Sequence, residues 1–211
     1  MTNPDPESST SRDELLQRLE LMEAMIAEGR GFTTHNAWIF VLWGLVDLAG
    51  WSWQNFVHTQ FAGTWAWPIC LIAGTVLTFA GKALQKKPQG VPNSVACGRV
   101  MAVWGMMGLA MAIYVASAMI THFAWQYSYV AALLMMIGMA HAISAVILHW
   151  RVQGVVAAIW WVGGAAILFL NSRRATNDIM LLEMCFGMIA FGLYTMWLEH
   201  RNGGGWIKKN A

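Results

Sequence analysis

Three ionisable side chains, Asp47, His141 and Glu183, lie inside long apolar stretches of this 211-residue sequence. An ionisable group in such a place is costly to insert into a membrane, which makes it a functional candidate by default. Asp47 and Glu183 could share a proton if their helices are neighbours, and His141 could relay that proton inward. The simpler interpretation is that each group is neutral and hydrogen-bonded to an adjacent helix.

Three tryptophans, Trp43, Trp104 and Trp161, recur at similar depth, each six to eight residues into an apolar stretch. Aligned in this way, they could line an aromatic cavity for a cation, a quinone or a pigment. A layer of tryptophans more commonly serves packing. The sequence therefore predicts no cofactor, while haem, quinone or pigment binding stays open.

Histidines at the ends of the apolar stretches are the other candidates for metal chemistry. His35, His149 and His200 could bind a metal ion if three helix ends converge, although histidine at a membrane interface is common without metal. A bis-histidine haem needs two ligands at one depth, and His141 has no histidine at its own depth. No catalytic residues and no metal site are predicted, and we do not expect an enzyme.

The composition indicates that these residues are held by an all-α integral membrane domain. The chain is 57% hydrophobic and only 11% charged, whereas soluble domains carry about 25% charged residues. Six apolar stretches are long enough to cross a bilayer. The predicted spans are 36–56, 65–84, 98–120, 127–149, 153–170 and 177–199. Together they form a predicted six-helix transmembrane domain over residues 36–200.

Similar stretches recur three times, which predicts three like-oriented helical hairpins. Each returning helix runs to a basic residue, and the three stretches are Trp67–Lys87, Tyr129–Arg151 and Ile179–Arg201. Small residues repeat within them at related spacings: Gly74 with Gly81, Gly138 with Ala145, and Gly187 with Gly192. Small residues let membrane helices approach closely. A parallel repeat about an axis along the membrane normal would follow.

Basic residues set the expected orientation. If the N-terminus is cytoplasmic, eleven Lys and Arg residues lie on that side (three, four, one and three in successive segments) and two on the other. The positive-inside rule then places both termini in the cytoplasm of a cell (inner) membrane. The bases cluster at helix ends, so a nucleic-acid partner is not expected. The outer turns are rich in aromatic residues: Trp51, Trp53, Phe56, Phe61, Trp65, Trp67, Phe123, Trp125, Tyr127 and Tyr129.

The N-terminal region is polar and acidic. Residues 1–10 contain two prolines and are expected to be a disordered tail. A capping box at Ser11–Glu14 then predicts a cytoplasmic amphipathic helix over 11–30, with Gly29 as its stop. Its apolar stripe consists of Leu15, Leu19, Met22 and Ile26. This stripe is expected to pack on the protein's own cytoplasmic face, on a second copy or on a partner. Residues 201–211 are expected to be a short cytoplasmic tail.

The three two-helix units, their Trp-Gly openings and the basic residue after each returning helix resemble the HdeD-type acid-resistance membrane proteins. The similarity would cover about residues 36–201. The proline-containing turn of that family is missing, since the turns here read NFVHTQFAG, THFAWQ and NSRRATND, and the acidic N-terminal helix is additional. The resemblance implies a membrane architecture and a link to envelope stress, with no catalytic residues.

Three functional hypotheses follow. The first is a non-enzymatic accessory or scaffold subunit that contacts a membrane-protein partner, or further copies of itself, through its N-terminal helix and aromatic outer loops. The second is a small proton-linked transporter or channel that uses Asp47, Glu183 and His141. The third is a subunit that binds haem, quinone or pigment, which only the tryptophan content favours.

Overall fold

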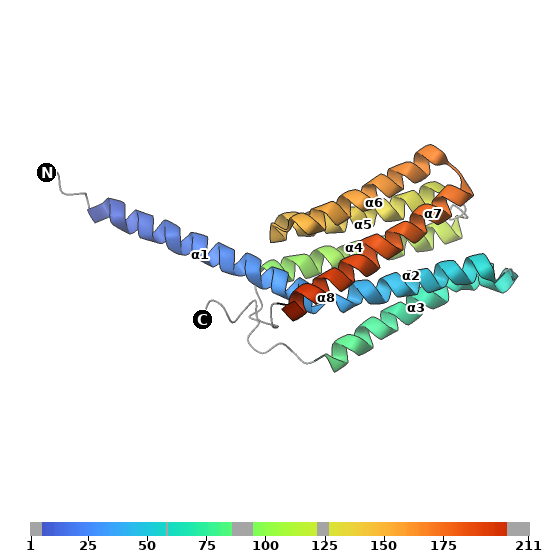
Figure 1. Cartoon of the computed structure of the whole chain (residues 1–211), viewed down its shortest axis with the longest axis horizontal. Helices are drawn as coiled ribbons and strands as arrows, with labels where there is room; N and C mark the ends of the chain where they lie inside the picture. The colour runs from blue at the N-terminus through green and yellow to red at the C-terminus, as the bar shows by residue number, and fades with distance from the viewer. Residues whose placement is uncertain (1–5, 58, 86–94, 122–126, 202–211) are drawn as a thin grey trace.

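The computed structural model of the chain describes residues 6–57, 59–85, 95–121 and 127–201, and the regular elements in these ranges are all helices (Figure 1). In chain order they are α1 (Pro6–His35), α2 (Trp38–Phe56), α3 (Gln60–Leu84), α4 (Val95–Ile120), α5 (Tyr127–Leu148), α6 (Arg151–Leu170), α7 (Arg173–Glu183), the π-helix η2 (Met184–Ala190) and α8 (Phe191–Arg201). The predicted all-helical class is confirmed for the described residues.

Five helical segments in the described residues are long and apolar enough to cross a membrane. They are Trp65–Leu84, Val95–Ile120, Tyr127–Leu148, Arg151–Leu170 and the continuous run Arg173–Arg201. A multi-pass membrane protein has this composition. Helix α2, which contains the first predicted span, is not among the five, and it carries Asp47 and a polar end with Ser52, Gln54 and Asn55.

The helices form a bundle whose core lies between α5, α6 and the run from α7 to α8. Helix α5 packs along α6 and also contacts α4, while α2 lies between α3 on one side and η2 and α8 on the other (Figure 1). The buried core cluster consists of Ala131, Leu134, Val156, Trp160, Ile167, Met188 and Phe191. Helices α3 and α4 are mostly exposed within the described chain.

The turn from α6 to α7 is encoded by two adjacent residues. Asn171 has the left-handed conformation, with φ 42°, in which asparagine often ends a helix. The Ser172 hydroxyl then accepts a hydrogen bond from the backbone N–H of Ala175 at 3.2 Å, so serine caps the N-terminus of α7. The chain therefore reverses within two residues, and α7 runs back along the bundle.

Glycines allow the close helix contacts that the small-residue spacing predicted. Gly74 lies against Val46, Gly138 against Trp160, and Gly192 against Val41, where an added Cβ would come within 3.2 Å of a neighbouring atom in each case. Gly105 is different, because no described atom beyond its chain neighbours and its own helix backbone lies within 4 Å of such a Cβ. The Trp104–Gly105 pair was expected to be one of three equivalent Trp-Gly pairs near the start of each hairpin. Its glycine makes no close contact with another described helix.

Helix α1 is longer than the helix expected over 11–30. It begins at Pro6, inside the segment expected to be a disordered tail, and it passes through Gly29 to His35. The expected stop at Gly29 is therefore wrong. The reason is tertiary packing: an added Cβ at Gly29 would lie 2.6 Å from Leu148 Cδ2 and 3.3 Å from Ala96 Cβ, so glycine serves here as a close contact and not as a helix end.

Some predicted features lie outside the described residues. They are the first part of the expected tail (residues 1–5), the turn with Phe123 and Trp125, and the C-terminal tail after Arg201.

Candidate functional site

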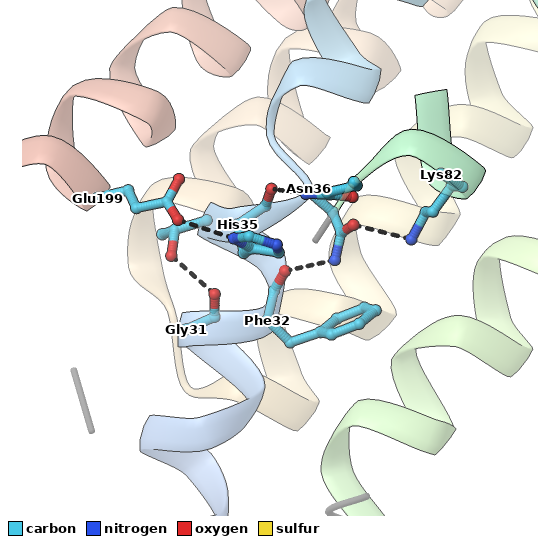
Figure 2. Close-up of polar contacts among 8 residues, drawn as sticks. Gly31, Phe32, His35, Asn36, Lys82 and Glu199 are labelled. Carbon is cyan, nitrogen blue, oxygen red and sulfur yellow. Dashed lines mark hydrogen bonds and ion pairs between the residues drawn. The ribbon is translucent and has the colours of Figure 1, made fainter. Parts of the chain in front are cut away.

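The junction between α1 and the bundle is held by polar contacts from several helices. His35 Nδ1 lies 3.0 Å from Glu199 Oε1 of α8 (Figure 2). On the opposite side of the junction, Lys82 Nζ of α3 donates to Asn36 Oδ1 at 2.8 Å, and its ammonium lies 5.3 Å from the centre of the Phe32 ring. Two helices distant in sequence thus hold the end of α1.

Two further side chains complete this junction. Gln85 Nε2 donates to the backbone carbonyl of His35 at 3.0 Å. Arg30 donates to the carbonyl oxygens of Leu148 at 2.8 Å and His149 at 2.6 Å, at the C-terminus of α5. A guanidinium there satisfies carbonyl groups that lack helical partners and matches the negative end of the helix dipole. We call Arg30, His35, Asn36, Lys82, Gln85 and Glu199 the α1 anchor.

Beyond the anchor, the first half of α1 projects away from the bundle (Figure 1). Three residues of the predicted apolar stripe are exposed there: Leu15 by 57%, Leu19 by 52% and Met22 by 51%. Leu16 and Leu21 are exposed as well. The described part of the chain's own bundle does not cover these residues, so packing of the stripe on a second copy or on a partner protein stays the prediction.

The edge histidines do not converge. His35 is paired with Glu199, His200 is exposed, and His149 occupies the turn after α5, where its φ is 48°. Within the described ranges, no three His, Cys, Asp or Glu side chains are grouped so that they could hold a metal ion.

His141 is enclosed by aromatic side chains in the interior of the bundle. Its ring centre lies 5.0 Å from that of Trp104, 5.3 Å from Phe191 and 5.6 Å from Phe40. The side chain is fully buried, and neither ring nitrogen has a hydrogen-bond partner among the described residues. A buried imidazole without a partner is unusual, because a lost hydrogen bond leaves the full desolvation cost of the group.

Four more buried polar side chains share this property: Ser144, Gln153, Trp160 and Glu183 each have buried polar atoms without a partner in the described structure. They follow the interior faces of α5, α6 and α7. The Glu183 carboxyl contacts Gly163, ten residues after Gln153 on α6. Ten residues of α-helix span roughly 15 Å, so this is the distance along α6 between Gln153 and the Glu183 carboxyl. We call His141, Ser144, Gln153, Trp160 and Glu183 the buried polar row.

Asp47 and Glu183, the two carboxyl groups of the predicted proton path, lie on neighbouring elements, because α2 packs on η2 and α8. Asp47 is half-buried, whereas Glu183 is buried and contacts Gly163 of α6. No hydrogen bond joins the two carboxyl groups in the described chain. Phe40, seven residues before Asp47 on α2, packs against His141. The proton shared by Asp47 and Glu183 stays a prediction.

The three predicted cavity tryptophans have different contacts. Trp43 lies against Gly74 of α3, and Trp104 against His141 of α5. Trp161 donates from Nε1 to the carbonyl of Met135 at 3.3 Å and is 42% exposed. Within the described residues, no ring contact joins any two of these three, and the aromatic cavity stays a prediction. The adjacent Trp160 is almost fully enclosed, at 2% exposed.

Sequence reasoning missed Ser144, Gln153 and Trp160. Ser144 follows His141 by three residues, so a helical wheel places both on one face. Gln153 and Trp160 are seven apart on α6, which again gives a common face. These spacings were visible in the sequence, whereas the contact between the two helix faces was not.

Comparisons of this chain with protein families, with curated protein sequences and with solved structures gave no match.

Proposed function

We propose that the chain is a six-span protein of the cell (inner) membrane, built as three hairpins, with α2 as the span that completes the five apolar segments. Two observations support α2 as a span. It lies along α3 (Figure 1), and it provides close contacts to α3 and α8 at Val46 and Val41. A helix in such a position shares the depth of its neighbours in a membrane.

Charge supports the orientation. Among the described residues, the bases at the end of the bundle with the α1 anchor are Arg30, Lys82, Arg99, Arg151 and Arg201, whereas Arg173 and Arg174 begin α7 at the opposite end. By the positive-inside rule this end faces the cytoplasm. The projecting half of α1 is then a cytoplasmic arm, and we define the arm as residues 14–26.

The function best supported by this geometry is that of a non-enzymatic scaffold. The observation that carries it is the apolar surface of the arm, which the described bundle leaves uncovered although the α1 anchor fixes the base of the helix. Exposed contiguous apolar surface on a rigid element is typical of protein contact sites. The resemblance to HdeD-type proteins would add envelope stress as the setting, a prediction that rests on sequence alone.

Site-specific photocross-linking in cells tests this function. With a photoreactive phenylalanine analogue in place of Leu19, we expect one discrete adduct heavier than a single chain, because the arm is a contact surface. The same analogue in place of Ile72, an exposed residue of the apolar helix α3, is the control and should give no such adduct. Adducts absent at Leu19, or equal at the two positions, would reject the scaffold function.

The buried polar row favours a second candidate, the proton-linked transporter or channel. Unpartnered polar atoms extend through the interior of three helices, and Glu183 directly precedes the π-helix η2. Single π-helical turns occur frequently at functional sites. In this version of the hypothesis Glu183 and His141 carry the proton with Ser144 and Gln153. Asp47, whose carboxyl is not among the buried groups without a partner, lies outside the path.

Proton flux into vesicles that contain the purified protein tests the second candidate. Glu183→Gln should reduce the flux at least about tenfold, because an amide cannot release a proton in the membrane interior. Asp47→Asn is the matched control and should leave the flux unchanged. A protein without measurable flux, or equal loss in both variants, would refute the proton path in this form.

A further inference from the structure

The apolar surface of the arm has the spacing of a coiled-coil seam. Leu15, Leu19, Met22 and Ile26 follow one another at intervals of four, three and four residues. This is the alternation of the d and a positions in a seven-residue repeat, in which both positions face a partner helix. The next two positions of the repeat, Gly29 and Thr33, are buried in the chain's own bundle. The available seam therefore ends at Ile26.

Charged residues beside the seam fit a second copy of the same helix. In this register Arg18 occupies a g position and Glu23 the following e position, five residues later. In a parallel pair of identical helices, g of one helix approaches the following e of the other, so Arg18 meets the partner copy's Glu23 twice by symmetry. Both side chains are exposed, and neither forms an ion pair within the described chain.

Membrane insertion favours the same parallel arrangement. All copies of a protein in one membrane share an orientation, so their arms leave the surface on the same side and point the same way. The α1 anchor fixes the base of each arm through Arg30 and His35. The seam from Leu15 to Ile26 is only roughly 17 Å long by helical rise. Confinement to one membrane surface raises the effective concentration and supports such a short contact.

We infer that two copies of this chain associate through a parallel coiled coil of their arms, with Leu15, Leu19, Met22 and Ile26 in the seam and Arg18 paired with Glu23 of the other copy. This inference rests on the proposed scaffold function and identifies its contact as a homodimer.

Cysteine cross-linking in vesicles tests the seam. In a background with Cys70, Cys97 and Cys185 changed to alanine, Met22→Cys places two thiols face to face at the seam. Its intermolecular disulfide should form at least about tenfold faster than that of Leu21→Cys, because the latter position points away from the seam and cannot reach disulfide geometry. Leu21 is also exposed, by 65% against 51% for Met22, and it lies one residue away. Equal rates, or no disulfide at Met22, would overturn the inference.

A charge swap tests the identity of the partner. Arg18→Glu and Glu23→Arg should each weaken self-association, measured by energy transfer between labelled copies in phosphatidylcholine vesicles, by about threefold to tenfold. The double variant restores both pairs in a homodimer and should recover the original association. A double variant no better than the single ones would overturn the inference. If the partner of the arm were a different protein, the double variant would not recover its association with that partner.

The two failures are distinguishable. If the photocross-linked adduct at Leu19 contains another protein and Met22→Cys gives no dimer, the scaffold function stands and the homodimer is rejected. If no adduct forms at Leu19 and no disulfide forms at Met22, both are rejected.

Discussion

The Gly192→Leu variant should unfold at markedly lower denaturant than the unmodified protein. An added Cβ at Gly192 would lie 2.6 Å from Val41 Cγ2, 2.9 Å from the Val41 backbone nitrogen and 3.2 Å from the Ala37 carbonyl oxygen. Two of these atoms are backbone atoms, one in α2 and one in Ala37 directly before it, and they cannot rotate away, so α2 and α8 must separate. Overpacking costs about 1–3 kcal/mol, and we expect a loss near the upper end, about 3 kcal/mol.

The matched control for this variant is Gly105→Leu. Gly105 is also a helical glycine in an apolar segment, but no described atom beyond its chain neighbours and its own helix backbone lies within 4 Å of its added Cβ. Unfolding by sodium dodecyl sulfate in mild detergent, followed by tryptophan fluorescence, gives the two midpoints. If both leucines shift the midpoint equally, the contact between α2 and α8 is not the close one described.

Replacing Trp160 by alanine should destabilise the bundle far more than replacing Trp161. The Trp160 ring is 2% exposed and covers Gly187, where an added Cβ would lie 2.7 Å from the indole nitrogen. Its removal leaves a cavity in the core at a cost of about 3 kcal/mol, the low end of the range for such changes, because apolar lipid reduces the transfer contribution. Trp161 is 42% exposed, so Trp161→Ala loses one long hydrogen bond and partial packing on Gly138, and it should cost about 1 kcal/mol.

Comparison of the two tryptophan variants uses the same unfolding measurement. Both changes remove an identical side chain from neighbouring positions of α6, so differences in helix propensity cancel. A larger loss for Trp161→Ala would contradict the assignment of Trp160 to the core. Equal losses of unfolding free energy in the two variants would show that Trp160 and Trp161 are both packed against neighbouring helices.

The sequence was sufficient to predict that the described chain is helical and that most of its helices are long and apolar. Such features depend on local composition and spacing, which are read without knowledge of neighbours. The helix stop at Gly29 was wrong for the opposite reason. Its glycine lies against Leu148, which is 119 residues away in the sequence, and nothing local distinguishes a close-contact glycine from a terminating one.

The candidate sites depend still more on distant contacts. Asp47, His141 and Glu183 were found because charge is rare in apolar segments, but the rings that enclose His141 come from three other helices, α2, α4 and α8. Lys82 was interpreted only as a marker of orientation, and its bond to Asn36 crosses 46 residues. No spacing rule connects positions so far apart.

The passage from α1 to α2 has no flexible linker. Only Asn36 and Ala37 separate the two helices, and backbone hydrogen bonds continue across them, from Asn36 to Phe32, from Ala37 to Thr34 and from Phe40 to Ala37. A junction of this kind couples the orientation of α1 to that of α2. A displacement of the distal end of α1 therefore tilts α2, and it changes the packing of α2 against Gly192 without a rearrangement of the intervening chain.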